Sequence, residues 1–544
     1  MTDAPARPSP IRRGGMMLQS IIFAGGTMVS RVLGFARDAV ITAVLGASQT
    51  IAADAFYTAN SFPNLFRRIL AEGAFTAAFV PSYSRKLTGD EADADRFASD
   101  ALASVATAAI VIAVVCMLAM PWLMYAINPG YVDEPAKFRL AIVLTQITMM
   151  YLPFIVIASL FASVLNARGR FAVSALYPTI LNIANLAAVL PQKEPVAAAY
   201  AASISVLVAG LLQASIVWWF ARKTGARIRI VRPRLTPEMK QLIRIGGPNA
   251  LSQSATQVNI FITGILASQV AGGRTWNEVA ARLYQLPLSL VGVAIGVALL
   301  PRLAQALQRK DHDEAQGSMD LAMVFALALS LPAAAALVSI PFFLIDGLFT
   351  RGEFLAADSA GAATLLLHFG WGVPAFVLLR ILQPAFFARD DTKTPMKYSL
   401  ISVAVNIVLG VSLFPLIGLA GIAVATSTAA WVSVLQMAAA LWRRDVYRPS
   451  RQAMSKMARI TAASVIMGFA LAAASYFRPV YEAPLHAVLE HGAKEISLVV
   501  VCGLGALLYA VLLFAFGGVT LAEARTAFKR RKGEAAAAPP ADLS

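Results

Sequence analysis

The segment ALASVATAAIVIAVVCMLAMPWLMYAI, residues 101–127, decides the fold, because it has no charged side chain and is long enough to cross a bilayer as one helix. The hydrocarbon core of a bilayer takes about 20 apolar residues in helical form. The whole chain shares this character: 58% of its 544 residues are hydrophobic, 14% are charged, and the mean hydropathy is +0.67. Soluble domains carry roughly 25% charged residues. We therefore expect an all-α polytopic membrane protein and exclude a disordered chain, a coiled coil and an ordinary soluble enzyme.

Fourteen apolar segments of this kind lie between charged or Pro/Gly-rich breaks, so we predict about 14 transmembrane helices. We divide them into an N-terminal six-helix bundle (17–221), a basic cytoplasmic linker (222–240), a C-terminal six-helix bundle (241–442) and two extra helices within 443–518. Cytoplasmic tails flank them at 1–16 and 519–544, the second partly disordered. The predicted spans are 17–46, 52–84, 97–127, 138–166, 171–191, 196–221, 241–271, 276–305, 317–345, 358–388, 396–414, 417–442, 457–477 and 495–518.

The 46 basic residues are distributed unevenly among the loops between these spans. The loops on the side of the two termini hold 33 of them, and the opposite loops hold seven. Cytoplasmic loops are enriched in Lys and Arg, so we predict that both termini are cytoplasmic. The net charge of +16 then reflects topology and implies no nucleic-acid partner. The remaining six basic residues lie inside predicted spans and are Arg31, Arg37, Arg67, Arg68, Arg282 and Arg380.

These six arginines indicate the class of ligand. Each costs roughly 2.5–3.5 kcal/mol at the centre of a spanning helix, and the clear acids in the spans are only Asp38, Asp54 and Glu72. Arg68 and Glu72 have the i,i+4 spacing of a local ion pair, whereas the adjacent residues Arg37 and Asp38 are expected to point in different directions. About three positive charges are left over. They favour a polyanion such as pyrophosphate, which arginine binds bidentately.

The first two spans contain residues that can interrupt a helix. Gly34 lies between two charged residues, and Pro63 lies shortly before Arg67. Broken helices line the central sites of secondary transporters, although Pro63 is equally consistent with a simple kink. The spans 52–84 and 276–305 both contain an internal proline and a second one near their end. This parallel favours two six-helix bundles around a central cavity, with alternating access to its two sides.

Four runs of sequence closely resemble the MurJ (MviN) family of lipid II flippases, which belongs to the multidrug/oligosaccharidyl-lipid/polysaccharide exporter superfamily. They are SRVLGFARD (30–38), FPNLFRRILAEGAF (62–75), ARLYQLP (281–287) and ARDDTKTP (388–395). The resemblance covers nearly the whole chain. It implies a multi-pass protein of the bacterial inner membrane that carries undecaprenyl-pyrophosphate-linked peptidoglycan precursor to the outer leaflet. It also implies no covalent catalysis, no cofactor, and the peptidoglycan synthesis machinery as a candidate partner.

The same resemblance implies roles for individual residues. We expect no metal site, because the sodium ligands proposed for some family members have no convincing counterpart in this chain. We expect the prenyl tail to lie along the two extra helices. By motif, the substrate-binding residues are Arg31, Arg37, Arg67 and Arg282, the supporting residues are Arg68 and Arg380, and the gating or functional acids are Asp54, Glu72 and Asp38.

Three other functions remain open from the residues alone. A flippase for another prenyl-pyrophosphate-linked glycan, of the exopolysaccharide or O-antigen type, would need the same arginines. A membrane glycan polymerase or ligase would need catalytic groups outside the membrane. The longest outer loop, 478–494, offers Glu482, His486, Glu490 and His491, whose spacing matches no metal or triad pattern. For a scaffold without a transport role, six intramembrane arginines are expensive, although the acids of a partner could pair with them.

Overall fold

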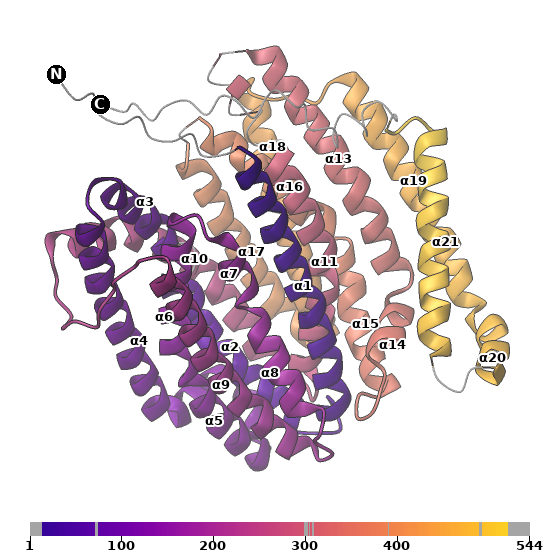
Figure 1. Cartoon of the computed structure of the whole chain (residues 1–544). Helices are drawn as coiled ribbons and strands as arrows, with labels where there is room; N and C mark the ends of the chain where they lie inside the picture. Colours follow the sequence, from indigo (N-terminus) through magenta and orange to yellow (C-terminus); the bar gives the residue numbers. More distant parts are fainter. Residues whose placement is uncertain are drawn as a thin grey trace. The chain divides into compact units, whose positions relative to one another are not determined.

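The chain is built from α-helices in the computed structural model (Figure 1). The structure describes residues 13–70, 74–298, 303, 305, 306, 309, 311–389, 391–488 and 492–519. Within these ranges the β-type pairing is confined to one isolated bridge between Arg351 and Phe354. The prediction of an all-α protein is confirmed.

Two compact units divide the chain. Unit 1 consists of Met1–Val279 and Phe349–Gly361, and unit 2 of Ala280–Leu348 and Ala362–Ser544. The helices of unit 1 are α1 (Arg13–Leu45), α2 (Ala52–Leu70), α3 (Ala74–Gly89), α4 (Glu91–Ile127), the 3-10 turn η1 (Pro129–Tyr131), α5 (Pro135–Met149), α6 (Tyr151–Ala167), α7 (Phe171–Leu176), α8 (Thr179–Val189), α9 (Pro195–Lys223) and α10 (Pro237–Ala267).

Three helices contain residues of both units: α11 (Gly273–Ala298), α14 (Pro341–Phe349), of which only the last residue belongs to unit 1, and α15 (Ala356–Gly370). The remaining helices belong wholly to unit 2. They are α13 (His312–Ser339), α16 (Val373–Phe387), α17 (Lys393–Ile417), α18 (Leu419–Arg443), α19 (Arg451–Tyr476), α20 (Arg478–Val488) and α21 (Ala493–Ala515). The predicted bundle boundaries, 17–221 and 241–442, stay predictions.

Several long helices begin at a residue whose side chain accepts a backbone N–H of the first turn. Such caps satisfy donors that the helix itself cannot. In α9 and α10 a proline follows the cap, where its missing N–H costs nothing. The capping residues are Asp90 of α4, Glu194 of α9, Thr236 of α10, Asp311 of α13 and Ser450 of α19.

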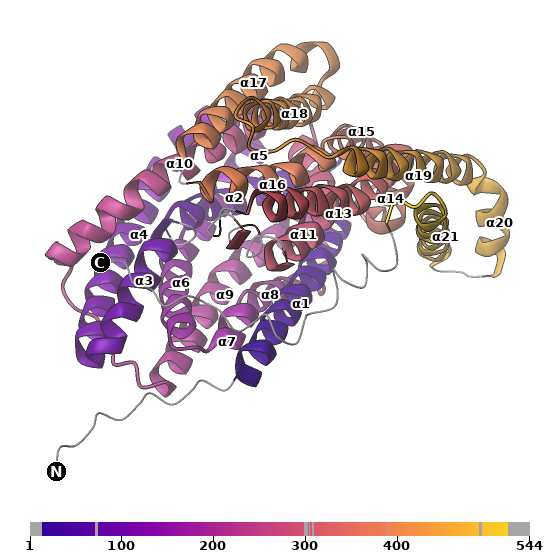
Figure 2. The same cartoon turned by 90° about the horizontal axis from the view of Figure 1, so that it is seen from above.

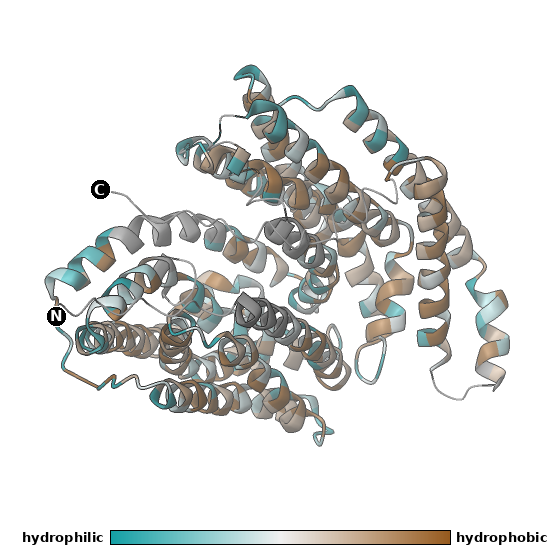
Figure 3. Cartoon of the chain, turned by 45° about the horizontal axis from the view of Figure 1, so that its top comes forward, coloured by the Kyte–Doolittle hydropathy of each residue, from teal (hydrophilic) through white to brown (hydrophobic). Residues whose placement is uncertain are grey.

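Ten helical segments among the described residues are long and apolar enough to cross a membrane. Figure 3 shows hydrophobic residues along the long helices and hydrophilic residues near their ends. Many apolar side chains also face outward, among them Leu118 and Trp122 of α4, which are 71% and 72% exposed. Such side chains need lipid around them, so the chain is a multi-pass membrane protein.

These ten segments match ten of the predicted spans. The other four, 17–46, 52–84, 241–271 and 276–305, overlap α1, α2 with α3, α10 and α11, which are helical but not among the ten. The total of fourteen therefore stays a prediction. Three of these four predicted spans carry intramembrane arginines, which lower their hydropathy.

The first helix is continuous where the sequence suggested an interruption. Gly34 lies inside α1, which packs against α7 and α8 (Figure 1). A Cβ at Gly34 would lie 3.6 Å from Asn182 Nδ2 of α8, and that amide donates a hydrogen bond of 2.9 Å to the Ser30 carbonyl. Pro63 likewise lies inside α2. A Cβ at this distance would make an ordinary contact, so Gly34 neither interrupts the helix nor is required for its packing, and the expected break at this position is wrong.

The basic linker after α9 is attached to unit 1 by buried polar groups. Asp95 of α4 accepts a hydrogen bond from the backbone N–H of Arg227, at 2.6 Å, and forms an ion pair with Arg168, at 3.1 Å. Ser99, one turn along α4, accepts the N–H of Arg229 at 3.0 Å. The Arg227 and Arg229 side chains stay exposed, so the linker keeps its positive charge at the surface.

Candidate functional site

Two of the predicted cavity arginines lie on α1. Arg31 is exposed, on a stretch where Met28, Val29 and Val32 are also at least half exposed. Arg37 is half-buried, and its Nε and Nη2 both donate to Asp38 Oδ1, at 2.9 and 2.6 Å. The expectation that Arg37 and Asp38 point apart is wrong, because the long Arg37 side chain turns so that its guanidinium reaches the carboxylate of the adjacent Asp38. Asp38 therefore neutralises Arg37, while Arg31 stays accessible to a ligand.

Two further arginines lie in the last turn of α2. Arg67 is half-buried and donates from Nε to Asn64 Oδ1 at 3.2 Å, so its guanidinium is oriented by its own helix. Arg68 is exposed. Its predicted partner Glu72 lies outside the described residues, so the i,i+4 ion pair stays a prediction.

The last two arginines belong to unit 2. Arg282 lies on α11 and is half-buried. Two residues further along the helix, the ring of Tyr284 packs on Phe369 with centroids 4.8 Å apart. Arg380 lies on α16 and is exposed. The structure thus gives α1 and α2 of unit 1 four of the six arginines and unit 2 the other two.

Asp54 has an environment that its sequence context did not reveal. Its carboxylate is fully buried and forms an ion pair with Lys137 Nζ of α5, at 2.9 Å. It also accepts the backbone N–H groups of Gly272 and Thr275 at 3.0 Å each, and the Thr275 hydroxyl at 2.7 Å. One carboxylate therefore ties together the start of α2, the start of α5 and the first turn of α11, all within unit 1.

The surroundings of Lys137 complete this cluster. Its ammonium group lies 4.6 Å from the centre of the buried Tyr131 ring, a cation–π distance. The Tyr131 hydroxyl contacts Thr58 Oγ1 at 3.1 Å and donates to the Asp54 carbonyl at 3.3 Å. Since Asp54 forms an ion pair with Lys137, its charge is not available to the six arginines.

A second buried carboxylate, Asp358 of α15, holds the same turn of α11. It is fully buried and accepts Trp276 Nε1 at 3.1 Å and the backbone N–H groups of Ser48 and Leu355 at 3.0 Å each. Sequence reasoning missed this residue, because Asp358 is the first residue of a predicted span and resembles an ordinary helix-end acid. The neighbouring tryptophan and serine are distant in the chain and gave no signal.

Backbone contacts around these two acids are unusually close. Gly272, with φ of +77°, approaches Ser48 so that a Cβ would lie 2.9 Å from the Ser48 nitrogen. Gly352, with φ of +55°, approaches Ala43 so that a Cβ would lie 2.2 Å from its carbonyl oxygen. Any other residue at Gly352 would clash with backbone. The α1–α2 turn, the start of α11 and the 350–358 segment are therefore interlocked.

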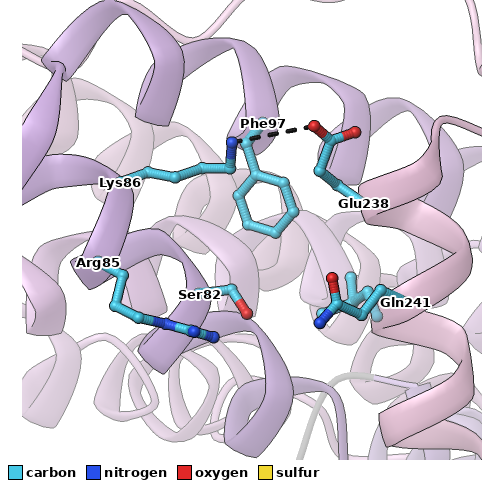
Figure 4. A pocket seen from close by; sticks show the side chains of 7 residues that line it. Ser82, Arg85, Lys86, Phe97, Glu238 and Gln241 are labelled. Carbon is cyan, nitrogen blue, oxygen red and sulfur yellow. Dashed lines mark ion pairs between the residues drawn. The ribbon is translucent and has the colours of Figure 1, made fainter. Parts of the chain in front are cut away.

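A pocket of about 330 Å³ lies elsewhere in unit 1, between the ends of α3, α4 and α10 (Figure 4). Lys86 at its rim pairs with Asp93 at 2.6 Å and reaches Glu238 at 4.0 Å. None of the arginines predicted to bind substrate lines it, so it is not the predicted cavity. Its lining residues are Ser82, Arg85, Lys86, Phe97, Glu238, Gln241 and Leu242.

The run 388–395, which carries part of the family resemblance, forms a clamp at the start of α17. Asp391 accepts the backbone N–H of Thr394 at 3.0 Å and pairs at 2.6 Å with Arg444, the residue that follows α18. Arg444 also donates to the Thr394 hydroxyl, at 3.0 Å. The hydrogen bonds from Thr394 and Arg444 lower the pKa of Asp391 from the usual 3.8 to about 2. The motif thus joins α17 to α18 through an ionised carboxylate.

We expect the Asp391→Asn protein to melt below the wild type at neutral pH, with a difference that shrinks on acidification. Because the pKa is lower in the folded state, the carboxylate stabilises the fold above about pH 4, and this stabilisation is lost as the pH falls towards 2. The measurement is the Tm of the purified protein between pH 7 and pH 3. Asp133→Asn, at an exposed loop position, is the matched control. A difference that stays constant over this range would contradict the assignment.

Comparisons with known proteins agree on one family. The sequence model described as "Lipid II flippase MurJ" matches residues 41–489. A "Probable lipid II flippase MurJ" of Rhizobium tropici is 35% identical over 94% of this chain and 96% of its own length, and that of Rhizobium meliloti (strain 1021) is 37% identical over 93% and 95%. The "Lipid II flippase MurJ" of Burkholderia cenocepacia is 33% identical over 82% and 87%.

Solved structures agree on the fold. A structure titled "Lipid II flippase MurJ, inward closed conformation" superposes with a TM-score of 0.75, at 22% identity, over 91% of this chain and 98% of the other. An inward-facing multidrug resistance MATE family transporter of the MOP superfamily superposes with a TM-score of 0.61, at 16% identity, over 78% and 97%. At these identities the likeness concerns the fold alone.

Proposed function

The chain belongs to the lipid II flippase MurJ family and flips lipid II, and from this premise we propose that its intramembrane arginines bind the pyrophosphate of the substrate. Arg31, Arg37 and Arg67 of unit 1 and Arg282 of unit 2 supply the guanidinium groups, with Arg68 and Arg380 in support. Arginine binds phosphate oxygens bidentately and stays ionised when partly buried. The substrate is moved without covalent chemistry.

The observation that supports this proposal most is the pairing of Asp54. Its partner is Lys137, at 2.9 Å, and its other ligands are groups of the α11 turn. An acid that the sequence offers as a counter-ion for the arginines is therefore engaged elsewhere. Arg31 is exposed on a helix of a membrane protein, and a diphosphate compensates its charge when it binds.

We propose a gating role for the two buried acids of unit 1. By the distribution of basic residues, the α1–α2 turn and the start of α5 lie on the outer side of the membrane. Asp54 and Asp358 fasten the first turn of α11 to these segments, which keeps the outer side of unit 1 closed. Opening towards the outer leaflet requires these hydrogen bonds to break. When the two carboxylates accept them again, the protein returns to the state that is closed on the outer side. Asp38, through Arg37, and Glu72 are proposed as further functional acids.

The location and partners follow the same reasoning. We propose that the chain resides in the bacterial inner membrane with both termini in the cytoplasm, since 33 of the 46 basic residues lie in the loops on that side. The substrate is undecaprenyl-pyrophosphate-linked disaccharide-peptide, and its prenyl tail stays in lipid, next to α19 and α21. The enzymes of peptidoglycan synthesis are the expected partners.

Complementation tests the substrate. We expect the chain to restore growth and shape to bacteria depleted of their own lipid II flippase, because lipid II then accumulates in the inner leaflet. The control is a strain that lacks the flippase of an exopolysaccharide or O-antigen precursor, in which we expect no restoration of the glycan. Rescue of the second strain alone would contradict lipid II as the substrate and favour another prenyl-pyrophosphate-linked glycan.

A further inference from the structure

The short helix α20 occupies a defined place relative to the bilayer. It joins α19 and α21, which are consecutive candidate membrane spans and pack against each other (Figures 1 and 2). The chain must therefore cross the membrane in α19, stay at one surface through α20, and cross back in α21. By the distribution of basic residues, this surface is the outer one.

One side of α20 is fastened to unit 2 by a cluster of four charges. Arg478 pairs with Glu482, one turn along the same helix, and with Asp346 of α14. Lys494 at the start of α21 reaches Asp346 at 3.1 Å, and the Arg478 guanidinium lies 4.4 Å from the centre of the Phe343 ring. Asp346 and Glu482 are buried. Glu482, an acid that the sequence offered for catalysis, therefore has a structural partner.

The opposite side of α20 is apolar and exposed. Val480 is 72% exposed, and Ala483, Pro484 and Ala487 are exposed as well. The spacing i, i+3, i+4, i+7 puts these four residues on one face of the helix. Arg478 and Glu482 lie about half a turn away from this face. We define the four residues as the apolar stripe of α20.

The apolar stripe continues surfaces that face lipid. At the end of α19 that adjoins α20, Tyr476 is 81% exposed and Phe477 is 57% exposed, and their rings contact each other with centroids 5.3 Å apart. Phe469 of α19 is 74% exposed and Val499 of α21 is 70% exposed. Exposed aromatic residues at the end of a span are typical of the membrane–water interface.

We propose that α20 is an interfacial helix whose apolar stripe lies in the headgroup–acyl boundary of the outer-leaflet phospholipids. Its charged side, held by Asp346, fixes the depth of α14 and of the α19–α21 pair relative to the bilayer. An amphipathic helix that joins two spans buries its apolar face in this boundary. Lipid is favoured over a protein partner because the stripe is continuous with the lipid-facing sides of α19 and α21.

Spin labels measure the depth of the stripe. Single cysteines are introduced as Val480→Cys, Phe469→Cys and Lys193→Cys in a background of Cys116→Ala and Cys502→Ala, and the full-length protein is reconstituted in phosphatidylethanolamine/phosphatidylglycerol vesicles. The ratio of collision with oxygen to collision with a water-soluble nickel chelate rises with depth. Lys193, exposed in the turn before α9, is the control in water, and Phe469 is the control in lipid. Each labelled protein is first shown to flip lipid II.

The proposal predicts an order of ratios. Position 480 should lie between the two controls, above position 193 and below position 469. Labels at positions 483 and 487 should give ratios like that at 480, since they share the stripe. A ratio at position 480 equal to that at 193 would place the helix in water and overturn the proposal. Exclusion of both reagents from position 480 would indicate a protein partner or a second copy of the chain, which overturns it equally.

Discussion

Bacteria that depend on an Arg31→Ala variant of this chain should fail to grow, although the protein is inserted at the normal level. Arg31 is exposed on α1, so its removal leaves no packing defect. In the bound state Arg31 is one partner of a desolvated, hydrogen-bonded charge pair with the phosphate. Its loss costs about 2–5 kcal/mol of binding free energy, which lowers the rate of flipping at least about 30-fold. The measurement is complementation after depletion of the host flippase, with the membrane level of the protein followed on the same cells.

Three further variants separate recognition of phosphate from a general effect of charge. Arg282→Ala should behave like Arg31→Ala, and Arg31→Lys should retain partial activity, because lysine keeps the charge but loses the bidentate geometry. Arg139→Ala, at an exposed position of α5 outside the predicted site, should grow normally. Normal growth of both Arg31→Ala and Arg282→Ala strains would contradict the role of these arginines.

The Asp54→Asn variant should be strongly destabilised. It leaves the Lys137 ammonium buried without its counter-charge, and removing one partner of a buried ion pair costs about 3–5 kcal/mol. The substitution also replaces one carboxylate oxygen, which accepts the backbone N–H of Gly272 or Thr275, by an amide NH2 group. Two hydrogen-bond donors would then face each other. We expect a lower Tm of the purified protein and loss of complementation.

A double-mutant cycle assigns this loss to the ion pair. Lys137→Met should be milder, because the Asp54 carboxylate keeps its hydrogen bonds from Gly272 and Thr275. The Asp54→Asn/Lys137→Met protein should melt above Asp54→Asn, since the uncompensated lysine is gone. Lys193→Met at the surface should change the free energy of unfolding by less than about 0.5 kcal/mol. If Lys137→Met lowers the Tm of Asp54→Asn further, the account of this pair is wrong.

Much of the fold follows from the sequence because hydropathy is a local property. Ten predicted spans match long apolar helices, with ends that differ by at most six residues. Hydropathy weakens where arginines enter a span, as in α2, where polar residues and Pro63 share the helix with Arg67 and Arg68. The helices are still present there, because packing in the tertiary structure overrides local composition.

The candidate site is harder to predict from the sequence than the fold. Its ion pairs depend on which segments, distant in the chain, come into contact in the folded protein. Asp54 and Lys137 lie 83 positions apart in the chain, and the sequence predicts Lys137 to be an ordinary lysine of a loop between two spans. Asp358 gave no signal, since its partners Ser48 and Trp276 are ordinary residues of other segments. The sequence also does not predict the ion pair of the adjacent residues Arg37 and Asp38. Helix geometry fixes the directions of the Cα–Cβ bonds, but the long arginine side chain can rotate towards its neighbour.

The transport of labelled lipids in proteoliposomes tests the role of the arginines most directly. Two substrates are compared: lipid II, and the same glycan-peptide attached to the prenyl chain through a single phosphate. The wild-type protein should make lipid II accessible in the opposite leaflet far faster than the monophosphate lipid, and the Arg31→Ala/Arg282→Ala protein should move neither. Transport of lipid II at the wild-type rate by this double variant, at equal amounts of folded protein, would contradict recognition of pyrophosphate by the intramembrane arginines.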